Sequence, residues 1–210
     1  MLRFSGLLLV LISLGFAQVF PEGIRTAPFQ CPPSENQREP QNETEAQEFA
    51  LRAKYREVLP AYLTALGDTA NESILMPVEG VKTADVTDTW GAARAGGRFH
   101  EGQDIFASAG TPIYSATEGF VYRVGSAPLG GNIVTVVGAA GHRYYYAHLQ
   151  SFANGLQEGQ YVTPDTLLGF VGNTGNARST PPHLHFGIYV GDENPCNWNA
   201  IDPLPFIVNR

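Results

Sequence analysis

The residues of this sequence best suited to chemistry are its histidines. Only five occur, and four of them stand in three short segments beside other metal-binding or polar residues. His183 and His185 lie two apart within Pro181 to Val190, where apolar and polar residues alternate. Because residues two apart share one face of a strand, both imidazoles can converge on one site. The apolar residues between them are then free to pack on the opposite face.

A second segment contains His100 and Asp104, four residues apart. Three glycines close by disfavour a helix, so the spacing predicts a loop that leads into a strand. A turn in such a loop can bring the imidazole and the carboxylate together. Ile105 and Phe106, which follow, are expected to begin a buried run.

These residue types together indicate a metal site. Two neutral imidazoles and one carboxylate suit zinc, and three protein ligands leave a fourth position for water or a substrate carbonyl. His148 shares strand parity with Tyr144 and Tyr146 and can point toward the same face as the metal residues. A single histidine is more often structural, but the combination favours catalysis. His142 lies in a predicted hairpin turn and is interpreted as structural.

At these residues the sequence resembles the lysostaphin-type, or LytM-like, zinc endopeptidases of the M23 peptidase family. The resemblance covers about Met76 to Pro203. Each short motif is weak by itself, but their order is specific. The motifs are Thr89 to Arg94, His100 to Asp104, Gly110 to Pro112, Tyr146 to Leu149 and Pro182 to Phe186.

The resemblance implies a role for each of the five residues. His100, Asp104 and His185 become the ligands of one zinc ion, and His148 and His183 become catalytic residues that do not bind the metal. Degenerate members of the family typically lose such residues, and none is missing here. The resemblance therefore implies a zinc metalloendopeptidase that cuts peptide cross-links of bacterial peptidoglycan, in wall remodelling or in lysis.

The residues leave the division of labour in catalysis open. Either His148 or His183 can take a proton from water while the other stabilises the oxyanion or protonates the leaving amine. Glu101 points away from the site if the local chain is extended, and it is not expected to be the base. The alternation of Tyr144 to Tyr146 sends at least one tyrosine into the core.

Two other functions fit the same sequence. One is a zinc-bound regulator of cell-wall amidases that does not hydrolyse, with the N-terminal segment covering the groove. The other is a secreted protease acting on Gly-rich proteins. Activity that appears only after truncation before Ser73 would indicate a latent enzyme.

The elements that must position these residues are mainly β. After about Ser73, short β-type runs alternate with Gly, Asn and Pro, and 23 glycines suit a sheet with many tight turns. The fold class is therefore a compact antiparallel β-sheet domain, residues 73–210, with an N-terminal helical segment, residues 42–72. The predicted strands are Pro112 to Ser115, Gly119 to Val124, Ile133 to Val137, Arg143 to His148 and Leu167 to Val171.

The helical segment has recognisable ends. Asn42 with Glu45 resembles a capping box, apolar residues recur at helical spacing up to Leu66, and Gly67 ends the run. Pro60 predicts a kink or two shorter helices. The apolar stripe is expected to cover a neighbouring core.

The chain before this helix reads as a targeting region. Residues 1–17 combine Arg3, an apolar run and small residues before the cut, which is typical of a secretory signal, and 18–41 form a Pro-rich linker. The apolar run is shorter than the ~20 residues of a membrane span. The protein is thus expected to be exported to the periplasm or the outside of the cell, without stable membrane insertion after cleavage.

The net charge limits the classes of possible partner, and the two cysteines are candidates for a disulfide. Without the signal, 12 basic and 20 acidic residues remain of the 13 and 20 in the whole chain, a net charge of −8 that argues against nucleic acid. Peptidoglycan peptide is the expected partner, and the oligomeric state is open. Cys31 and Cys196 can pair in an oxidising compartment or stay as thiols, and the sequence barely separates these alternatives.

Overall fold

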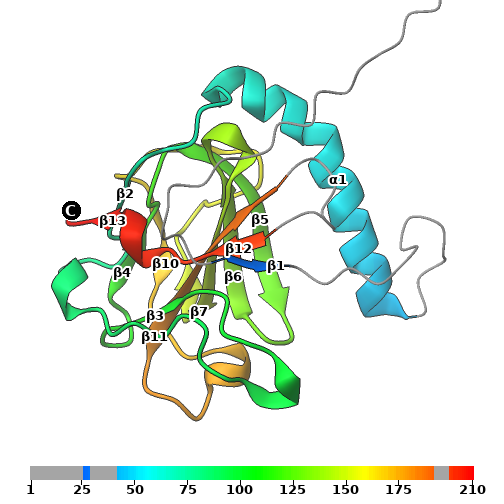
Figure 1. Ribbon diagram of the computed structural model, residues 1–210. Coiled ribbons are helices and arrows are strands. Elements are labelled where there is room, and N and C mark those ends of the chain that lie inside the picture. The colour runs from blue at the N-terminus through cyan, green and yellow to red at the C-terminus, as the bar shows by residue number, and fades with distance from the viewer. Residues whose placement is uncertain (1–25, 29–41, 192–198) are drawn as a thin grey trace, which may run out of the picture.

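The computed structural model describes residues 26–28, 42–191 and 199–210. Regular structure in this part of the chain is mainly β, with one α-helix, α1, over Glu43–Leu66 (Figure 1). Short 3-10 turns connect the strands at Thr83–Asp85, Ala95–Gly97, Ala139–Gly141, Gly175–Ala177 and Leu204–Phe206. The fold class predicted from the sequence is confirmed.

The largest sheet has eight strands and is antiparallel, with the order β1-β12-β11-β7-β6-β5-β9 and with β3 paired to β11. At one end of β11 the neighbours are β3 and β7, so that His185 lies opposite Asp104 on one side and Ala147 on the other. The bounds are β1 Thr26–Pro28, β3 Gln103–Phe106, β5 Gly119–Ala127, β6 Gly131–Val137, β7 Arg143–Leu149, β9 Tyr161–Val162, β11 His183–Val190 and β12 Asn199–Ile201.

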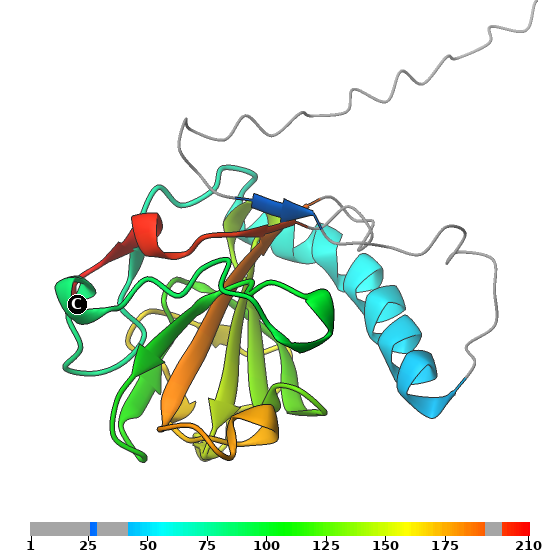
Figure 2. The ribbon, with the colours of Figure 1, turned by 60° about the horizontal axis from the view of Figure 1, so that its bottom comes forward.

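Two smaller sheets complete the β domain. One has the order β4-β10-β8 and is antiparallel, and the other is a parallel pair of β13 with β2. Their bounds are β2 Ile74–Leu75, β4 Pro112–Tyr114, β8 Ser151–Phe152, β10 Leu167–Phe170 and β13 Ile207–Val208. Figure 2 shows the strands of the large sheet side by side, with α1 at its flank.

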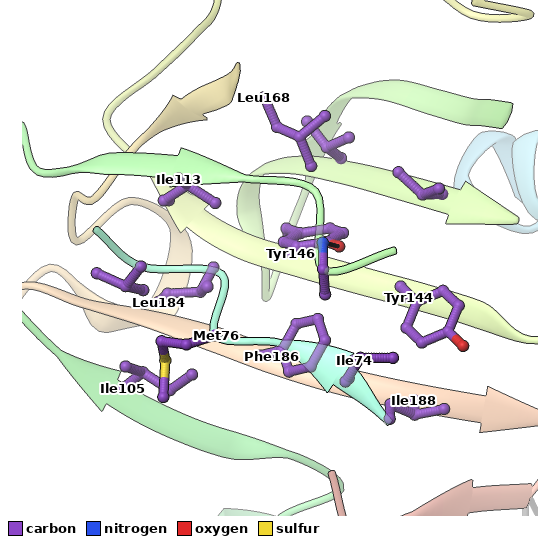
Figure 3. Close-up of a cluster of buried hydrophobic side chains, with 14 of the residues drawn as sticks. Ile74, Met76, Ile105, Ile113, Tyr144, Tyr146, Leu168, Leu184, Phe186 and Ile188 are labelled. Carbon is purple, nitrogen blue, oxygen red and sulfur yellow. Dashed lines mark hydrogen bonds between the residues drawn. The ribbon is translucent and has the colours of Figure 1, made fainter. Parts of the chain in front are cut away.

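The hydrophobic core lies on one face of the large sheet. Leu184 and Phe186 of β11 are fully buried there beside Tyr146 and Met76 (Figure 3). The Tyr146 hydroxyl accepts a hydrogen bond from the backbone N–H of Ala116 at 2.9 Å, which satisfies this polar group inside the core. Since this face is filled, the alternate residues of β11 point to the opposite face.

Most of the predicted elements are present. The five predicted strands are found with end shifts of a few residues, and His183 and His185 share one face of β11 as predicted. Phe106 was predicted to be buried, and this is wrong: it is 49% exposed because β3 ends there. The helix is a single one that contains Pro60, and Gly67, with φ of 84°, follows its last residue.

The C-terminal half of α1 packs on the β domain. Leu59 is buried against Tyr122 and Val137, and the ring of Tyr62 stacks on Phe120 with centroids 4.5 Å apart. This part of the apolar stripe is therefore structural, as predicted. Among the described helices, none has the length and apolar character of a membrane span.

Several predictions fall outside the described residues. These are the signal at 1–17, all but three residues of the linker at 18–41, and both members of the Cys31 and Cys196 pair.

Candidate active site

Three donor atoms converge where β3 meets β11. His100 Nε2 lies 2.8 Å from His185 Nδ1 and 3.0 Å from Asp104 Oδ1, and His185 Nδ1 lies 3.1 Å from the same carboxylate oxygen. The residues come from the loop before β3, from β3 itself and from β11, as the pairing of Asp104 with His185 requires. In the described part of the chain this is the single cluster of this kind.

The donor set fits one zinc ion. Zinc–nitrogen bonds of about 2.0–2.1 Å place tetrahedral ligand atoms roughly 3.3 Å apart, so separations of 2.8–3.1 Å need only a small outward adjustment. His100 Nδ1 lies 2.8 Å from the carbonyl oxygen of Thr89. Because a carbonyl only accepts, Nδ1 carries the proton, and the lone pair of neutral His100 is on Nε2, which faces the cluster.

The carboxylate of Asp104 is held from several sides. Arg94 Nη2 donates to Oδ2 at 2.8 Å, and the Asp104 backbone N–H donates to Thr89 Oγ1 at 2.9 Å. Burial raises the pKa of Asp104, but the contacts with His100 and His185 outweigh burial and hold this pKa far below its usual value. Asp104 is thus an anion with Oδ1 turned to the two imidazoles and Oδ2 to Arg94.

His148 and His183 stand beside the cluster, and His183 Nε2 lies 3.7 Å from Asp104 Oδ1. His148 Nδ1 donates to the carbonyl oxygen of Thr174 at 2.9 Å, and His183 Nδ1 donates to that of Pro181 at 2.8 Å. The two rings have centroids 5.0 Å apart, and both residues are buried. In its neutral form, a ring held in this way has its lone pair on Nε2.

The charge state of His148 follows from its surroundings. Burial and the neighbouring imidazoles of His185 and His183 lower the pKa of His148, and the Thr174 carbonyl and Asp104 oppose them only in part. The resulting pKa is about 4. At neutral pH the ring is uncharged and able to accept a proton.

The side chain of His148 lies on the site face, although the alternation along its strand would place it on the opposite face. Tyr144 and Tyr146 point into the core, whereas Tyr145 lies on the site face. His148 has φ of 65°, and the pairing of β6 with β7 shifts register beside it. The predicted shared parity is therefore wrong, because this bulge turns the side chain to the other face. The prediction that at least one tyrosine is core is confirmed.

The five residues lie in an open groove of about 940 Å³. Its rims carry three exposed apolar side chains, Phe99, Phe106 and Leu129, and Tyr145 and Tyr189 also line it. The remaining lining residues are Arg94, Gly96, Gly97, Arg98, His100, Glu101, Asp104, Gly130, Ala147, His148, Asn176, Ala177, Thr180, Pro181, His183 and His185.

Glu101 is also among the residues that line this groove. Burial raises the pKa of Glu101, and the nearby Arg98 and His100 side chains oppose this rise. None of the groove residues comes from the described helix α1, so this part of the N-terminal segment does not cover the site.

His142 lies outside the cluster, as predicted, at the end of the β6–β7 connection. Burial lowers the pKa of His142 to about 4, against 6.5 for an exposed imidazole. The unfolded chain then binds more protons than the folded one, so the contribution of this group to stability is present above pH 6.5 and is lost as the pH falls through 4.

We expect His142→Gln to flatten the acid dependence of folding stability. The shift of roughly 2.5 pKa units corresponds to about 3 kcal/mol at its full extent. Urea unfolding of metal-free wild type and variant at pH 7.5, 5.5 and 4.5 measures the difference. Parallel stability curves for the two proteins would contradict it.

The structure adds residues to which the sequence reasoning gave no role. Thr89 and Thr174 orient His100 and His148 through their carbonyl oxygens, and Arg94 pairs with Asp104. Thr89 and Arg94 lie within a motif of the resemblance, which was the one available signal. A backbone carbonyl can be supplied by any residue type, so its contact leaves no trace in the sequence.

This antiparallel β domain carries its histidine and aspartate cluster in an open groove, and the chain belongs to peptidase family M23. The sequence profile described as Peptidase family M23 matches residues 98–203. The chain is 40% identical over 126 residues to the L-Ala--D-Glu endopeptidase of Bacillus subtilis, which is 57% of this chain and 38% of that protein.

Two further similarities concern Staphylococcus simulans. Its lysostaphin is 35% identical over 113 residues, covering 53% of this chain and 22% of lysostaphin. The crystal structure of the lysostaphin catalytic domain superposes with a TM-score of 0.50 at 32% identity, covering 59% of this chain and 93% of that domain. The matched region thus spans well under half of both full-length relatives.

Proposed function

We propose that this chain is an exported zinc metalloendopeptidase that hydrolyses peptide cross-links of bacterial peptidoglycan. The observation that carries the proposal is the convergence of a two-histidine, one-carboxylate cluster with two further histidines in a single groove. Membership of family M23 and the endopeptidase names of the relatives support it.

In this proposal His100, Asp104 and His185 hold one zinc ion. Zinc at this position supplies Lewis-acid chemistry, by polarising the scissile carbonyl and acidifying water. The hydrogen bond to Thr89 keeps His100 in the tautomer that a metal ligand needs, and Arg94 leaves a single oxygen of Asp104 facing the cluster.

His148 and His183 act on protons. Neutral His148 can take a proton from the attacking water at Nε2 and pass the same proton to the departing amine. His183 can stabilise charge on the substrate oxygen when its own Nε2 carries a proton. Because both rings bond a backbone carbonyl through Nδ1, the reverse assignment is also possible. Both carry out proton transfer or charge stabilisation without binding the metal.

The groove is suited to an extended peptide. Phe99 and Leu129 are 66% and 50% exposed on its rims, and both can cover substrate atoms that the open groove leaves accessible to water. The Tyr145 and Tyr189 rings form an edge-on pair with centroids 6.2 Å apart in the same groove. Apolar rims and aromatic walls favour peptide over a charged polymer.

The place of action follows from the N-terminal sequence. We propose that residues 1–17 direct export and are removed, that 18–41 link them to the helical segment at 42–72, and that 73–210 form the peptidase domain. The protein then acts in the periplasm or outside the cell.

Metal removal and restoration test the proposal. Purified protein is analysed for bound metal, incubated with purified peptidoglycan, and the released peptides are identified by mass spectrometry. We expect one zinc per chain, new peptide termini, loss of hydrolysis after chelation and recovery with zinc. Zinc-loaded protein that releases nothing, with or without residues before Ser73, would refute hydrolysis and favour a regulatory module, whereas cleavage of Gly-rich proteins alone would refute the substrate.

We expect Gly102→Ala to weaken zinc binding. A Cβ at this position would lie 2.6 Å from the carbonyl oxygen of Phe186 and 2.7 Å from Cε1 of His185, so the ligand ring has to move. Displaced ligands typically reduce metal affinity by about 10–100-fold. Competition with a chromophoric chelator measures the change, and Gly125→Ala, which meets no atom within 4 Å, is the matched control.

A further inference from the structure

A buried amide lies directly behind the metal cluster. Gln103, next to Asp104 in β3, has no solvent exposure. Its Nε2 donates to Asp88 Oδ1 at 2.9 Å and to Asp202 Oδ1 at 2.8 Å. Its Oε1 accepts from the backbone N–H of Thr89 at 2.9 Å and from Thr89 Oγ1 at 3.2 Å. Both amide protons of Gln103 and its oxygen are therefore engaged.

The donor and acceptor roles of its partners fix the orientation of the Gln103 amide. A carboxylate only accepts hydrogen bonds, so the two aspartates require the nitrogen of Gln103 on their side. The oxygen must then face Thr89, whose backbone N–H can only donate. Asp202 is almost completely buried and accepts a second hydrogen bond from the backbone N–H of Leu204 at 3.1 Å, which holds the carboxylate in place.

Thr89, held by Gln103, in turn forms hydrogen bonds with two of the cluster residues. Its carbonyl oxygen accepts from His100 Nδ1, and its hydroxyl oxygen accepts from the backbone N–H of Asp104. The hydroxyl donates its own proton to Gln103, so the lone pairs of Oγ1 are turned toward Asp104. Three segments distant in sequence, around Asp88, Gln103 and Asp202, thus meet behind the cluster.

We infer that Gln103 is a positioning residue for the zinc site and that Asp202 anchors it. Gln103 fixes Thr89, and Thr89 in turn fixes the ring of His100 and the start of the Asp104 backbone. The inference rests on the proposed zinc site. It assigns Gln103 no contact with substrate or metal, since it acts through Thr89.

The isosteric change Gln103→Glu tests this role. Glutamate keeps the size of the side chain and one oxygen that can accept from Thr89, but its second oxygen replaces the donor to Asp88 and Asp202. Repulsion from these two carboxylates is expected to move the side chain and weaken its contact with Thr89. We expect zinc affinity, measured by competition with a chromophoric chelator, to fall by about 10–100-fold. Gln157→Glu adds the same charge at an exposed position outside the groove and is expected to bind zinc like the wild type.

A rescue separates this role from a general loss of structure. In Gln103→Glu with Asp202→Asn, the new asparagine can donate to the glutamate, and we expect part of the zinc affinity to return. Thermal unfolding of the metal-free proteins reports on the fold. Unchanged zinc affinity in folded Gln103→Glu would overturn the inference, and so would a double variant that binds zinc no better than the single one.

If Gln103→Glu does not fold, Thr89 offers a milder test. Thr89→Val removes the hydroxyl that joins Gln103 to Asp104, and Thr89→Ser keeps it. We expect weaker zinc binding in the valine variant alone, and equal affinities would overturn the inference. Absence of zinc binding by the wild type would instead refute the proposed function, so the two failures are distinguishable.

Discussion

His185→Ala is expected to lose both zinc and hydrolysis. The variant removes one of three donors and leaves His100 Nε2 and Asp104 Oδ1, 3.0 Å apart, as an incomplete site. Metal polarisation of a carbonyl is worth several kcal/mol of transition-state stabilisation, so a loss of at least about 1,000-fold follows. Metal analysis and the peptidoglycan assay measure both consequences on one preparation.

The control for this prediction is a histidine outside the groove. His142→Gln removes an imidazole from the same domain and is expected to retain zinc and hydrolysis. Hydrolysis retained in His185→Ala would contradict the proposed mechanism. Zinc retained at full occupancy without hydrolysis would instead show that His185 is a catalytic residue and not a ligand.

The fold could be predicted because its patterns are local. Alternation along Pro181 to Val190 placed His183 and His185 on one face, and that face is where the structure has them. Short runs between glycines marked the strands, because tight turns need residues that tolerate positive φ. Helical spacing up to Leu66 identified α1 for the same reason, since periodicity depends on neighbours along the chain.

Features that depend on distant segments were predicted poorly. A single positive φ at His148 reverses the face on which its side chain lies, and no residue type nearby indicates this bulge. The sequence also does not reveal that Gln103 meets Asp202, because 99 positions separate them. Phe106 shows a third limit, since an apolar residue beside a groove looks like a core residue in the sequence.

The bulge at His148 determines how its proposed catalytic role is best tested. Alanine would remove the imidazole and also place an unsuited residue at φ of 65°, which confuses strain with chemistry. Asparagine adopts this left-handed conformation more readily than other non-glycine residues and has no group that accepts a proton near neutral pH. His148→Asn therefore isolates the loss of proton transfer from the loss of backbone geometry.

We expect His148→Asn to keep its zinc and to lose about 100- to 10,000-fold in hydrolysis, the usual contribution of a positioned acid or base. Nδ1 of His148 forms a hydrogen bond with Thr174, and the ring is not one of the three donors of the cluster. Removing the imidazole is therefore expected to leave the ligands in place. The outcome differs from that of His185→Ala in a single respect, the metal content. Lost zinc in His148→Asn would make His148 a ligand, and full activity would leave His183 as the one proton-transfer residue of the groove.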